Sequence, residues 1–162
     1  MPTRSSWSYL PRKGETDSDQ RYTPQWVLDL VVKVMGQIDL DPCADPLKRV
    51  PAANHFTEED NGLERAWGGK VFLNPPYSGC ATWFKHLCIY AATGAVTEAI
   101  LLVPVTAMGS KGARMLMKQT ASAVTIFDRF FNFLGEDYQP LPFKSPIPLC
   151  LIYVGENTDR FL

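Results

Sequence analysis

The run Ala99–Val103 is apolar at every position, and it constrains the fold more than any other feature of the chain. A strand of this kind has no polar face to turn to water, so both faces of its sheet must be covered. Shorter apolar runs lie on either side of it, and segments with helical periodicity separate most of them. The expected strands are residues 37–41, 71–73, 123–127 and 149–154, and the expected helices are residues 24–36, 79–92 and 110–119. This alternation predicts a three-layer α/β fold with a mostly parallel sheet.

The expected strand 71–73 leads directly into Asn74-Pro75-Pro76-Tyr77. Two successive prolines fix two φ angles and remove two backbone donors, and the first of them biases Asn74 toward extended geometry. The segment is therefore a stiff platform that presents a side-chain carbonyl, backbone carbonyls and an aromatic ring. A base with an exocyclic amino group needs this set. The two hydrogens of the amino group require acceptors, and the ring of the base requires a π-face to stack on. The alternative is a simple turn after a strand.

A second polar strand end occurs at Asp41-Pro42, after the expected strand 37–41. In α/β proteins, ligands bind at the carboxyl ends of parallel strands, near a topological switch point. We therefore expect Asp41 and Asn74 to lie at the same edge of the sheet, where one site can hold both. Taken alone, Asp41-Pro42 is equally consistent with the simple end of a strand.

Several motifs stand in a characteristic order. They are Tyr22-Thr23-Pro24, Leu40–Ala44, Asp60–Leu63 with Trp67, Asn74–Ser78 with Trp83, Leu101–Pro104 and the Phe-rich segment Arg129–Phe133. In this order they resemble the phage-type Dam family of DNA N6-adenine methyltransferases, over about residues 20–155. The resemblance implies a Rossmann-like α/β/α methyltransferase fold, S-adenosylmethionine as the methyl donor, and double-stranded DNA with a flipped adenine as the acceptor.

The resemblance also assigns roles to residues. The catalytic residues would be Asn74, Pro75, Pro76 and Tyr77, and the cofactor-binding residues would be Thr23, Pro24, Asp41, Pro42, Ala44 and Asp60. Within the second group, Thr23 and Pro24 would lie near the methionine part of the cofactor, and Asp60 would reach its adenine. The chain departs from the methyltransferase pattern in two respects. The turn after Asp41 lacks the usual Gly-x-Gly, and no clear acidic residue ends a second strand to hold the ribose.

A base inside duplex DNA must be flipped out of the stack before it can reach such a site. Tyr77 is the candidate for stacking on the flipped adenine, with Phe131 or Phe133 on its other side. Lys111 and Arg114 fall on one face of the expected helix 110–119 and are candidates for phosphate contacts. The alternatives are that the phenylalanines belong to the core and that the basic helix face is merely solvated.

Composition limits the other possibilities. The chain has 162 residues and a net charge of −1, which counts against a strongly non-specific DNA binder. No apolar run approaches the ~18 residues of a membrane span. The four cysteines are scattered and match no common zinc pattern, so we expect reduced thiols, no metal site and a cytoplasmic protein of a bacterium or a phage-infected cell. Residues 1–21 are expected to form a flexible arm, and residues 22–162 a single methyltransferase domain.

Two other functions remain open at this stage. The Asn-Pro-Pro-Tyr motif also occurs in methyltransferases that modify RNA adenine or protein glutamine. A non-catalytic remnant that binds nucleic acid is the second alternative, and the missing glycine turn is its best support. The purpose of the methylation, whether in restriction–modification, regulation or counter-defence, does not follow from the sequence.

Overall fold

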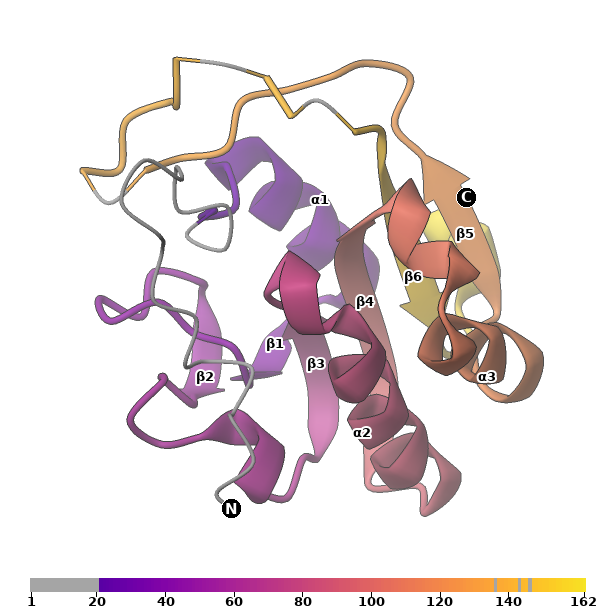
Figure 1. Cartoon of the computed structure of the whole chain (residues 1–162). Helices are drawn as coiled ribbons and strands as arrows, with labels where there is room; N and C mark the ends of the chain where they lie inside the picture. The colour runs from indigo at the N-terminus through magenta and orange to yellow at the C-terminus, as the bar shows by residue number, and fades with distance from the viewer. Residues whose placement is uncertain (1–20, 136, 143, 146) are drawn as a thin grey trace, which may run out of the picture.

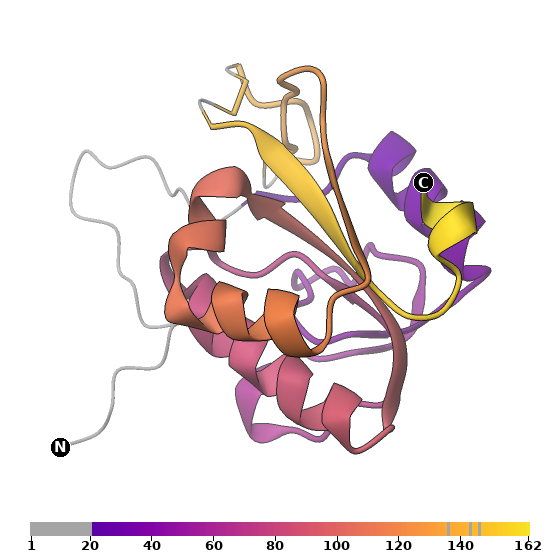
Figure 2. The ribbon, with the colours of Figure 1, turned by 90° about the vertical axis from the view of Figure 1, so that its right-hand side faces the viewer.

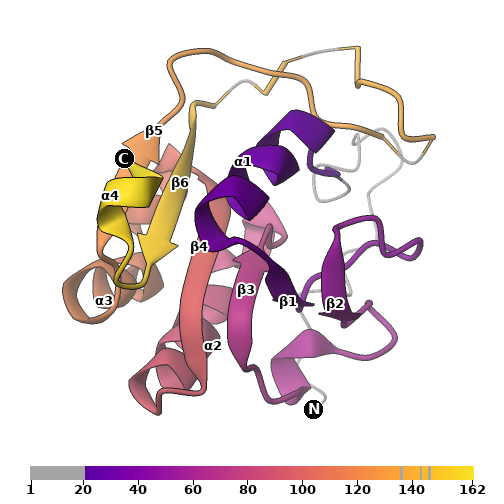
Figure 3. The ribbon, with the colours of Figure 1, turned by 180° about the vertical axis from the view of Figure 1, so that it is seen from behind.

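The residues described by the computed structural model, 21–135, 137–142, 144–145 and 147–162, form an α/β fold around a six-stranded sheet (Figure 1). The expected N-terminal arm lies almost entirely outside these residues. The strands are β1 (Ile38–Asp41), β2 (Ala52–His55), β3 (Gly69–Leu73), β4 (Val96–Pro104), β5 (Ala123–Ile126) and β6 (Leu149–Val154). Their order across the sheet is β2-β1-β3-β4-β6-β5, which Figure 3 shows from behind.

The sheet is mixed, so the expectation of a mostly parallel sheet is corrected. β2, β1, β3 and β4 pair in parallel, whereas β6 runs antiparallel to both of its neighbours, β4 and β5. The connections explain the difference. Helices carry the chain back across the sheet between β3 and β4 and between β4 and β5, as parallel strands require. The connection from β5 to β6, which contains no described helix, stays at the edge of the sheet where β5 ended, so β6 runs in the opposite direction.

Helices cover both faces of the sheet (Figure 2). α1 (Gln25–Met35) and the short α4 (Thr158–Phe161) lie on one face, and α2 (Cys80–Ala92) and α3 (Lys111–Gln119) lie on the other. The 3-10 helices η1 (Gly62–Glu64), η2 (Tyr77–Gly79) and η3 (Val105–Gly109) belong to the connections. α1 ends at Met35, one residue before the expected bound, and Gly36 caps it with a φ of 80° that suits a residue without a Cβ.

The central strands are buried on both faces, as their composition predicts. Along β3, Val71 and Leu73 pack toward α2, while Phe72 packs toward α1. β4 and β6 alternate in the same way, so each strand contributes to two cores. Trp67 and Trp83 are 2% and 0% exposed, so both are core residues. The rings of these two tryptophans stack at a centroid distance of 5.9 Å.

The long connection between β5 and β6 arches over the carboxyl edge of the sheet (Figure 1). Within it, Leu134 pairs with Tyr22 through two backbone hydrogen bonds of 3.0 Å. Residues 21–23, which we call the strap, are thus tied to this connection just before α1 begins. The carboxyl ends of β1 and β3 lie beneath it, side by side.

The described residues also bear on other expectations. None of their helices has the length and apolar character needed to cross a bilayer. The four cysteines are free thiols, and three of them, Cys80, Cys88 and Cys150, are buried. No group of three or more metal-ligating side chains comes together among the residues that are described.

Candidate functional site

Asn74 follows β3 at the carboxyl edge of the sheet, and the strap fixes the orientation of its amide. Nδ2 donates to the Arg21 carbonyl oxygen and to Thr23 Oγ1, both at 3.0 Å. An amide nitrogen has two hydrogens, so both are used. Oδ1 is consequently the polar atom of this side chain that stays available to a ligand. Pro75 and Pro76, which follow, are buried, so the amide sits on a rigid base.

Tyr77, three residues after Asn74, lies in an aromatic setting. Its ring centroid is 6.2 Å from that of Phe133, in an edge-to-face arrangement. The Arg21 guanidinium carbon lies 5.1 Å from the Tyr77 centroid and 5.9 Å from that of Phe133. Burial raises the pKa of the Tyr77 hydroxyl, which therefore stays protonated at neutral pH. The ring offers a π-face and not an acid or a base.

Asp41 ends β1, the neighbour of β3, so the two polar strand ends do share one edge, as the sequence predicts. Asp41 is 2% exposed, and its Oδ1 accepts a hydrogen bond of 3.2 Å from the Cys43 N–H. No cation lies within ion-pair distance of it among the described residues. Burial, with a further contribution from Asp45, raises the pKa of Asp41 to about 7. Such a carboxylate is stabilised by a ligand that brings positive charge.

The turn after Asp41 is held by backbone contacts. The Ala44 N–H donates to the Phe56 carbonyl, and the Phe56 N–H donates to the Asp41 carbonyl, each at 2.9 Å. Gly62 packs directly on this turn, because a Cβ built on it would lie only 2.0 Å from the Pro42 carbonyl oxygen. Trp67 Nε1 donates to the Gly62 carbonyl at 2.8 Å. The turn itself lacks glycine. The close approach between two backbone segments is made instead by Gly62, which belongs to another loop and packs on the turn.

We predict that Gly62→Ala destabilises the protein by ~1–3 kcal/mol, because the new methyl group forces the Pro42 turn or the Gly62 loop to shift. It should also weaken binding of any ligand held by the turn after Asp41. Thermal melts and ligand titrations measure the two effects. Gly109→Ala is the matched control, since no heavy atom lies within 4 Å of a Cβ placed there. Equal melting temperatures for the two variants would contradict this reading.

Asp60 precedes Gly62 and is engaged locally. Its Oδ2 accepts from the Thr57 N–H at 2.9 Å and from Thr57 Oγ1 at 3.1 Å. These hydrogen bonds, that of the N–H foremost, lower the pKa of Asp60, so it is ionised at neutral pH. The structure thus places Asp60 in the loop that packs on the Asp41 turn. Its role toward a cofactor adenine stays a prediction.

The other candidates are distributed less closely. Phe131 is buried and packs edge-to-face on Trp26, 5.1 Å away, and its neighbour Phe133 is the ring that contacts Tyr77. Lys111 and Arg114 are exposed on α3, and no described contact joins them to the strand ends. Of the residues predicted from the sequence, the structure brings together those of the strap, the Asp41 turn and the Asn74–Tyr77 corner.

Sequence reasoning missed three polar residues around this edge. Arg21 contributes both its carbonyl and its guanidinium, Asn61 buries an Oδ1 that has no hydrogen-bond partner, and Arg49 buries an equally unpartnered Nη1. Only Asn61 carried a signal, because it stands within the Asp60–Leu63 motif. The positions of Arg21 and Arg49 depend on contacts between loops that are distant in sequence.

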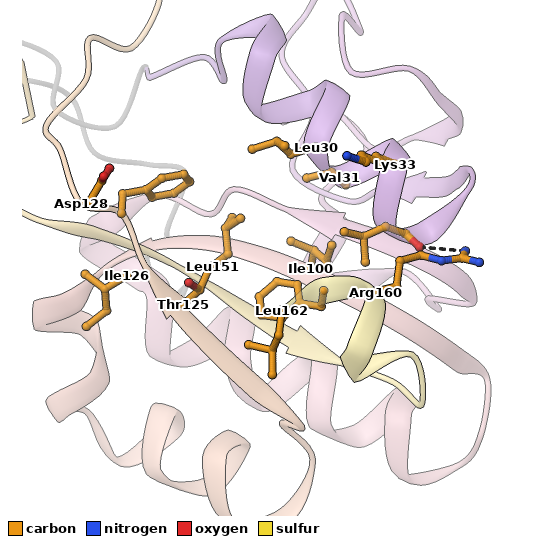
Figure 4. A pocket seen from close by; sticks show the side chains of 13 residues that line it. Leu30, Val31, Lys33, Ile100, Thr125, Ile126, Asp128, Leu151, Arg160 and Leu162 are labelled. Atoms are coloured by element: carbon orange, nitrogen blue, oxygen red, sulfur yellow. Dashed lines mark hydrogen bonds between the residues drawn. The ribbon is translucent and has the colours of Figure 1, made fainter.

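A separate cleft of about 390 Å³ lies on the α1 face of the sheet, between α1, β5 and α4 (Figure 4). Leu30, Ile126 and Leu151 are among its apolar lining residues. Arg160 at its rim donates to the Val34 carbonyl at 3.3 Å. None of the predicted catalytic or cofactor-binding residues lines this cleft. Its size therefore does not make it the candidate site, which the polar strand ends define.

Comparison with known proteins gives one family. The family model described as DNA N-6-adenine-methyltransferase (Dam) matches residues 12–130. The matched region contains the strap, the Asp41 turn, the Asp60 loop and the Asn74–Tyr77 corner. No curated protein matches the chain.

Proposed function

Because the chain belongs to the DNA N-6-adenine-methyltransferase family, we propose that it transfers a methyl group from S-adenosylmethionine to the N6 amino group of adenine in double-stranded DNA. The observation that carries this proposal is the Asn74 amide, whose nitrogen is fully used by the strap while its oxygen stays available. We assign the activity to one Rossmann-like domain, residues 22–162.

The residues at the carboxyl edge fit the cofactor chemically. S-adenosylmethionine carries a sulfonium and an ammonium, and the buried Asp41 is a carboxylate without a cationic partner among the described residues. Thr23, Pro24, Pro42, Ala44 and Asp60 would complete its binding site. When bound, the cofactor supplies an electrophilic methyl group on a sulfur that is a good leaving group.

The protein's own contribution concerns the amino group of adenine. That nitrogen is a poor nucleophile, because its lone pair is delocalised into the ring. Acceptors placed around its hydrogens stabilise the positive charge that develops during the reaction, and they act best when they are held in place beforehand. Asn74 Oδ1 and the Pro75 carbonyl are the acceptors we assign. No described donor engages the Pro75 carbonyl, whereas the Pro76 carbonyl already accepts from the Gly79 N–H at 3.1 Å.

The flipped base also needs a surface on which to stack. The Tyr77 ring packs against Phe133, and Arg21 links it to the Asn74 amide, because its guanidinium lies over the ring and its carbonyl accepts from Asn74 Nδ2. A base on this ring would therefore have its edge toward the acceptors. Phe131 packs against Phe133, with their ring centroids 5.3 Å apart. Lys111 and Arg114, which are exposed, remain our candidates for contacts with DNA phosphates.

We predict that Tyr77→Ala lowers kcat/KM for DNA by about 10- to 100-fold, because a base–aromatic stack contributes ~1–3 kcal/mol. Initial rates at saturating cofactor measure the effect. Tyr77→Phe is the matched control, since it keeps the ring and removes only the hydroxyl, and it should stay within a few fold of the wild type. If Tyr77→Phe lost as much activity as Tyr77→Ala, the hydroxyl rather than the ring would be the important group.

The proposed function is tested by incubating the purified protein with labelled S-adenosylmethionine and, separately, duplex DNA, RNA and protein acceptors. We expect label in N6-methyladenine from DNA alone. Label in RNA adenine or in glutamine would replace the acceptor that we propose. A protein that neither transfers label nor gains thermal stability from the cofactor would be a non-catalytic member of the family.

A further inference from the structure

Arg49, in the connection between β1 and β2, holds a guanidinium whose hydrogen bonding is incomplete. Its Cζ lies 3.4 Å from the ring centroid of Tyr138 and 5.7 Å from that of Tyr22. Nη1 is buried and has no hydrogen-bond partner within the part of the chain that the structure describes. Buried donors are nearly always paired. An unpaired donor such as Nη1 is therefore expected at a ligand-binding site, where the ligand supplies the acceptor.

Arg49 also has no counter-ion among the described residues. The ion pairs among the described residues are Lys70–Glu98 and Arg129–Asp128, neither of which involves it. Asp45, the nearest acidic residue in sequence, accepts from backbone N–H groups instead: Oδ1 from that of Leu47 at 2.8 Å, and Oδ2 from that of Arg49 itself at 3.2 Å. The guanidinium is therefore a half-buried cation whose charge no carboxylate of the described residues neutralises.

Asp41, the last residue of β1 before this connection, shows the complementary deficit. It is a buried carboxylate that has no cationic partner in the described part of the chain, and it lies eight positions earlier in the sequence. The chain geometry brings the two residues near each other: Asp41 pairs with His55 across β1 and β2, and His55 Nε2 contacts the carbonyl of Val50, the neighbour of Arg49, at 2.7 Å. Burial is the main factor that raises the pKa of the Tyr138 hydroxyl. The negative charges of Asp45 and Asp41 raise this pKa further, and the positive charge of Arg49 lowers it. Asp41 and Arg49 nevertheless form no ion pair with each other.

A ligand that satisfies both groups must carry an ammonium and a carboxylate together. The methionine part of S-adenosylmethionine is such a zwitterion. We propose that Arg49 binds the α-carboxylate of the cofactor while Asp41 receives its ammonium group. This inference rests on the proposed function, because it takes S-adenosylmethionine as the cofactor. It also supplies a binding residue that no motif of the sequence indicated.

The surroundings of Arg49 support the assignment. Tyr22, whose ring flanks the guanidinium, is followed in the strap by Thr23, the residue that accepts from the Asn74 amide. The strap therefore connects the guanidinium to the Asn74–Tyr77 corner. The bound cofactor would have to span the same two places, because its sulfur lies between its carboxylate and the reacting amine. Tyr138 adopts a φ of 62°, a left-handed conformation that is uncommon for a residue of this size. Such conformations are concentrated at binding sites.

The experiment compares two ligands that differ in the amino-acid part. S-adenosylhomocysteine has it, and 5′-methylthioadenosine keeps the adenosine and the sulfur but lacks it. Calorimetric titration of Arg49→Met should show affinity for S-adenosylhomocysteine reduced at least tenfold and affinity for 5′-methylthioadenosine unchanged within about twofold. Arg49→Lys keeps the charge but loses the bidentate geometry, so it should fall between Arg49→Met and the wild type. Lys48→Met, which removes an exposed cation one position away, is the matched control and should behave as the wild type does.

The results that would overturn the inference are distinct from those that would overturn the proposed function. If Arg49→Met weakened both ligands equally, Arg49 would only support the Tyr138 loop. If neither affinity changed, it would have no part in binding. Should Arg49→Met fail to fold, the ratio of the two affinities in Arg49→Lys decides, and an unchanged ratio refutes the assignment. A wild-type protein that binds neither nucleoside would instead refute the proposed cofactor itself.

Discussion

Replacing Asn74 by alanine is expected to reduce methyl transfer by about 10²–10³-fold or more, while binding of S-adenosylhomocysteine stays close to the wild-type level. The loss follows from the role of Oδ1, which we assign as an acceptor held ready for the amino group of adenine. Single-turnover rates with preformed cofactor complex measure the chemical step, and calorimetry measures the affinity.

A second consequence of this substitution must be separated from the first. The Asn74 amide also donates to the Arg21 carbonyl and to Thr23 Oγ1, so its removal leaves two acceptors of the strap unpaired. Unpaired buried groups destabilise by ~1–3 kcal/mol each, and a melting curve reports that cost. Asn54→Ala is the matched control, because Asn54 is exposed on β2 and donates only to the Asp39 carbonyl at 3.3 Å. Near wild-type turnover in Asn74→Ala would refute the catalytic assignment.

The strands of the core could be read from the sequence, because their burial leaves a continuous apolar run. Residues 149–154 were expected as a strand and form β6 with the same bounds. β2 was missed because Ala52–His55 contains neither an apolar run nor an alternating pattern. It lies at the edge of the sheet with both central residues exposed, so its pairing with β1 comes from the backbone alone.

Local capping was predictable only in part. The expected helix 79–92 begins slightly later than predicted, because after the Asn74–Tyr77 corner the chain first makes the turn η2, and α2 begins at Cys80 with Gly79 at its N-cap. The start of α3 is different, since Ser110 Oγ accepts from the Ala113 N–H at 3.0 Å. Two prolines before Tyr77 impose the geometry of that corner and delay the start of the helix.

The residues of the candidate site were also predictable only in part from the sequence. The polar residues at strand ends, Asp41 and Asn74, could be placed at one edge because topology requires it. Arg21 and Arg49 could not, since each depends on tertiary contacts: Arg21 lies over Phe133, and Arg49 lies over Tyr138. Both aromatic residues belong to the long connection between β5 and β6, whose path above the sheet no local pattern specifies.

The second large effect concerns Asp41 and the pH dependence of stability. Burial raises the pKa of Asp41 to about 7, against about 3.9 for a carboxyl group in the unfolded chain. Folding therefore favours the protonated form. The penalty for ionising the buried group is absent at low pH, grows as the pH rises from about 4 to about 7, and is then constant. Its full size corresponds to about 4 kcal/mol.

Asp41→Asn is accordingly expected to melt several degrees above the wild type at pH 8, and the difference should shrink toward pH 5, where the wild-type carboxyl group is protonated. The amide keeps the shape and the acceptor that the Cys43 N–H uses. Asp29→Asn, on the exposed side of α1, changes the net charge equally and should melt as the wild type does. A constant difference between Asp41→Asn and the wild type from pH 5 to pH 8 would mean that Asp41 is not the titrating group.

The same substitution should weaken binding of S-adenosylhomocysteine at least tenfold, because the ammonium group loses its carboxylate. In the wild type, affinity should rise with pH between about 6 and 8, since the ligand binds the ionised form of Asp41, and Asp41→Asn should remove most of this rise. A single buried carboxylate would then account for both the instability of the free protein and its affinity for a cation. The two effects have one cause. The ammonium group that neutralises Asp41 belongs to the ligand, so the charge of Asp41 stays unneutralised, and destabilises the protein, until the ligand binds.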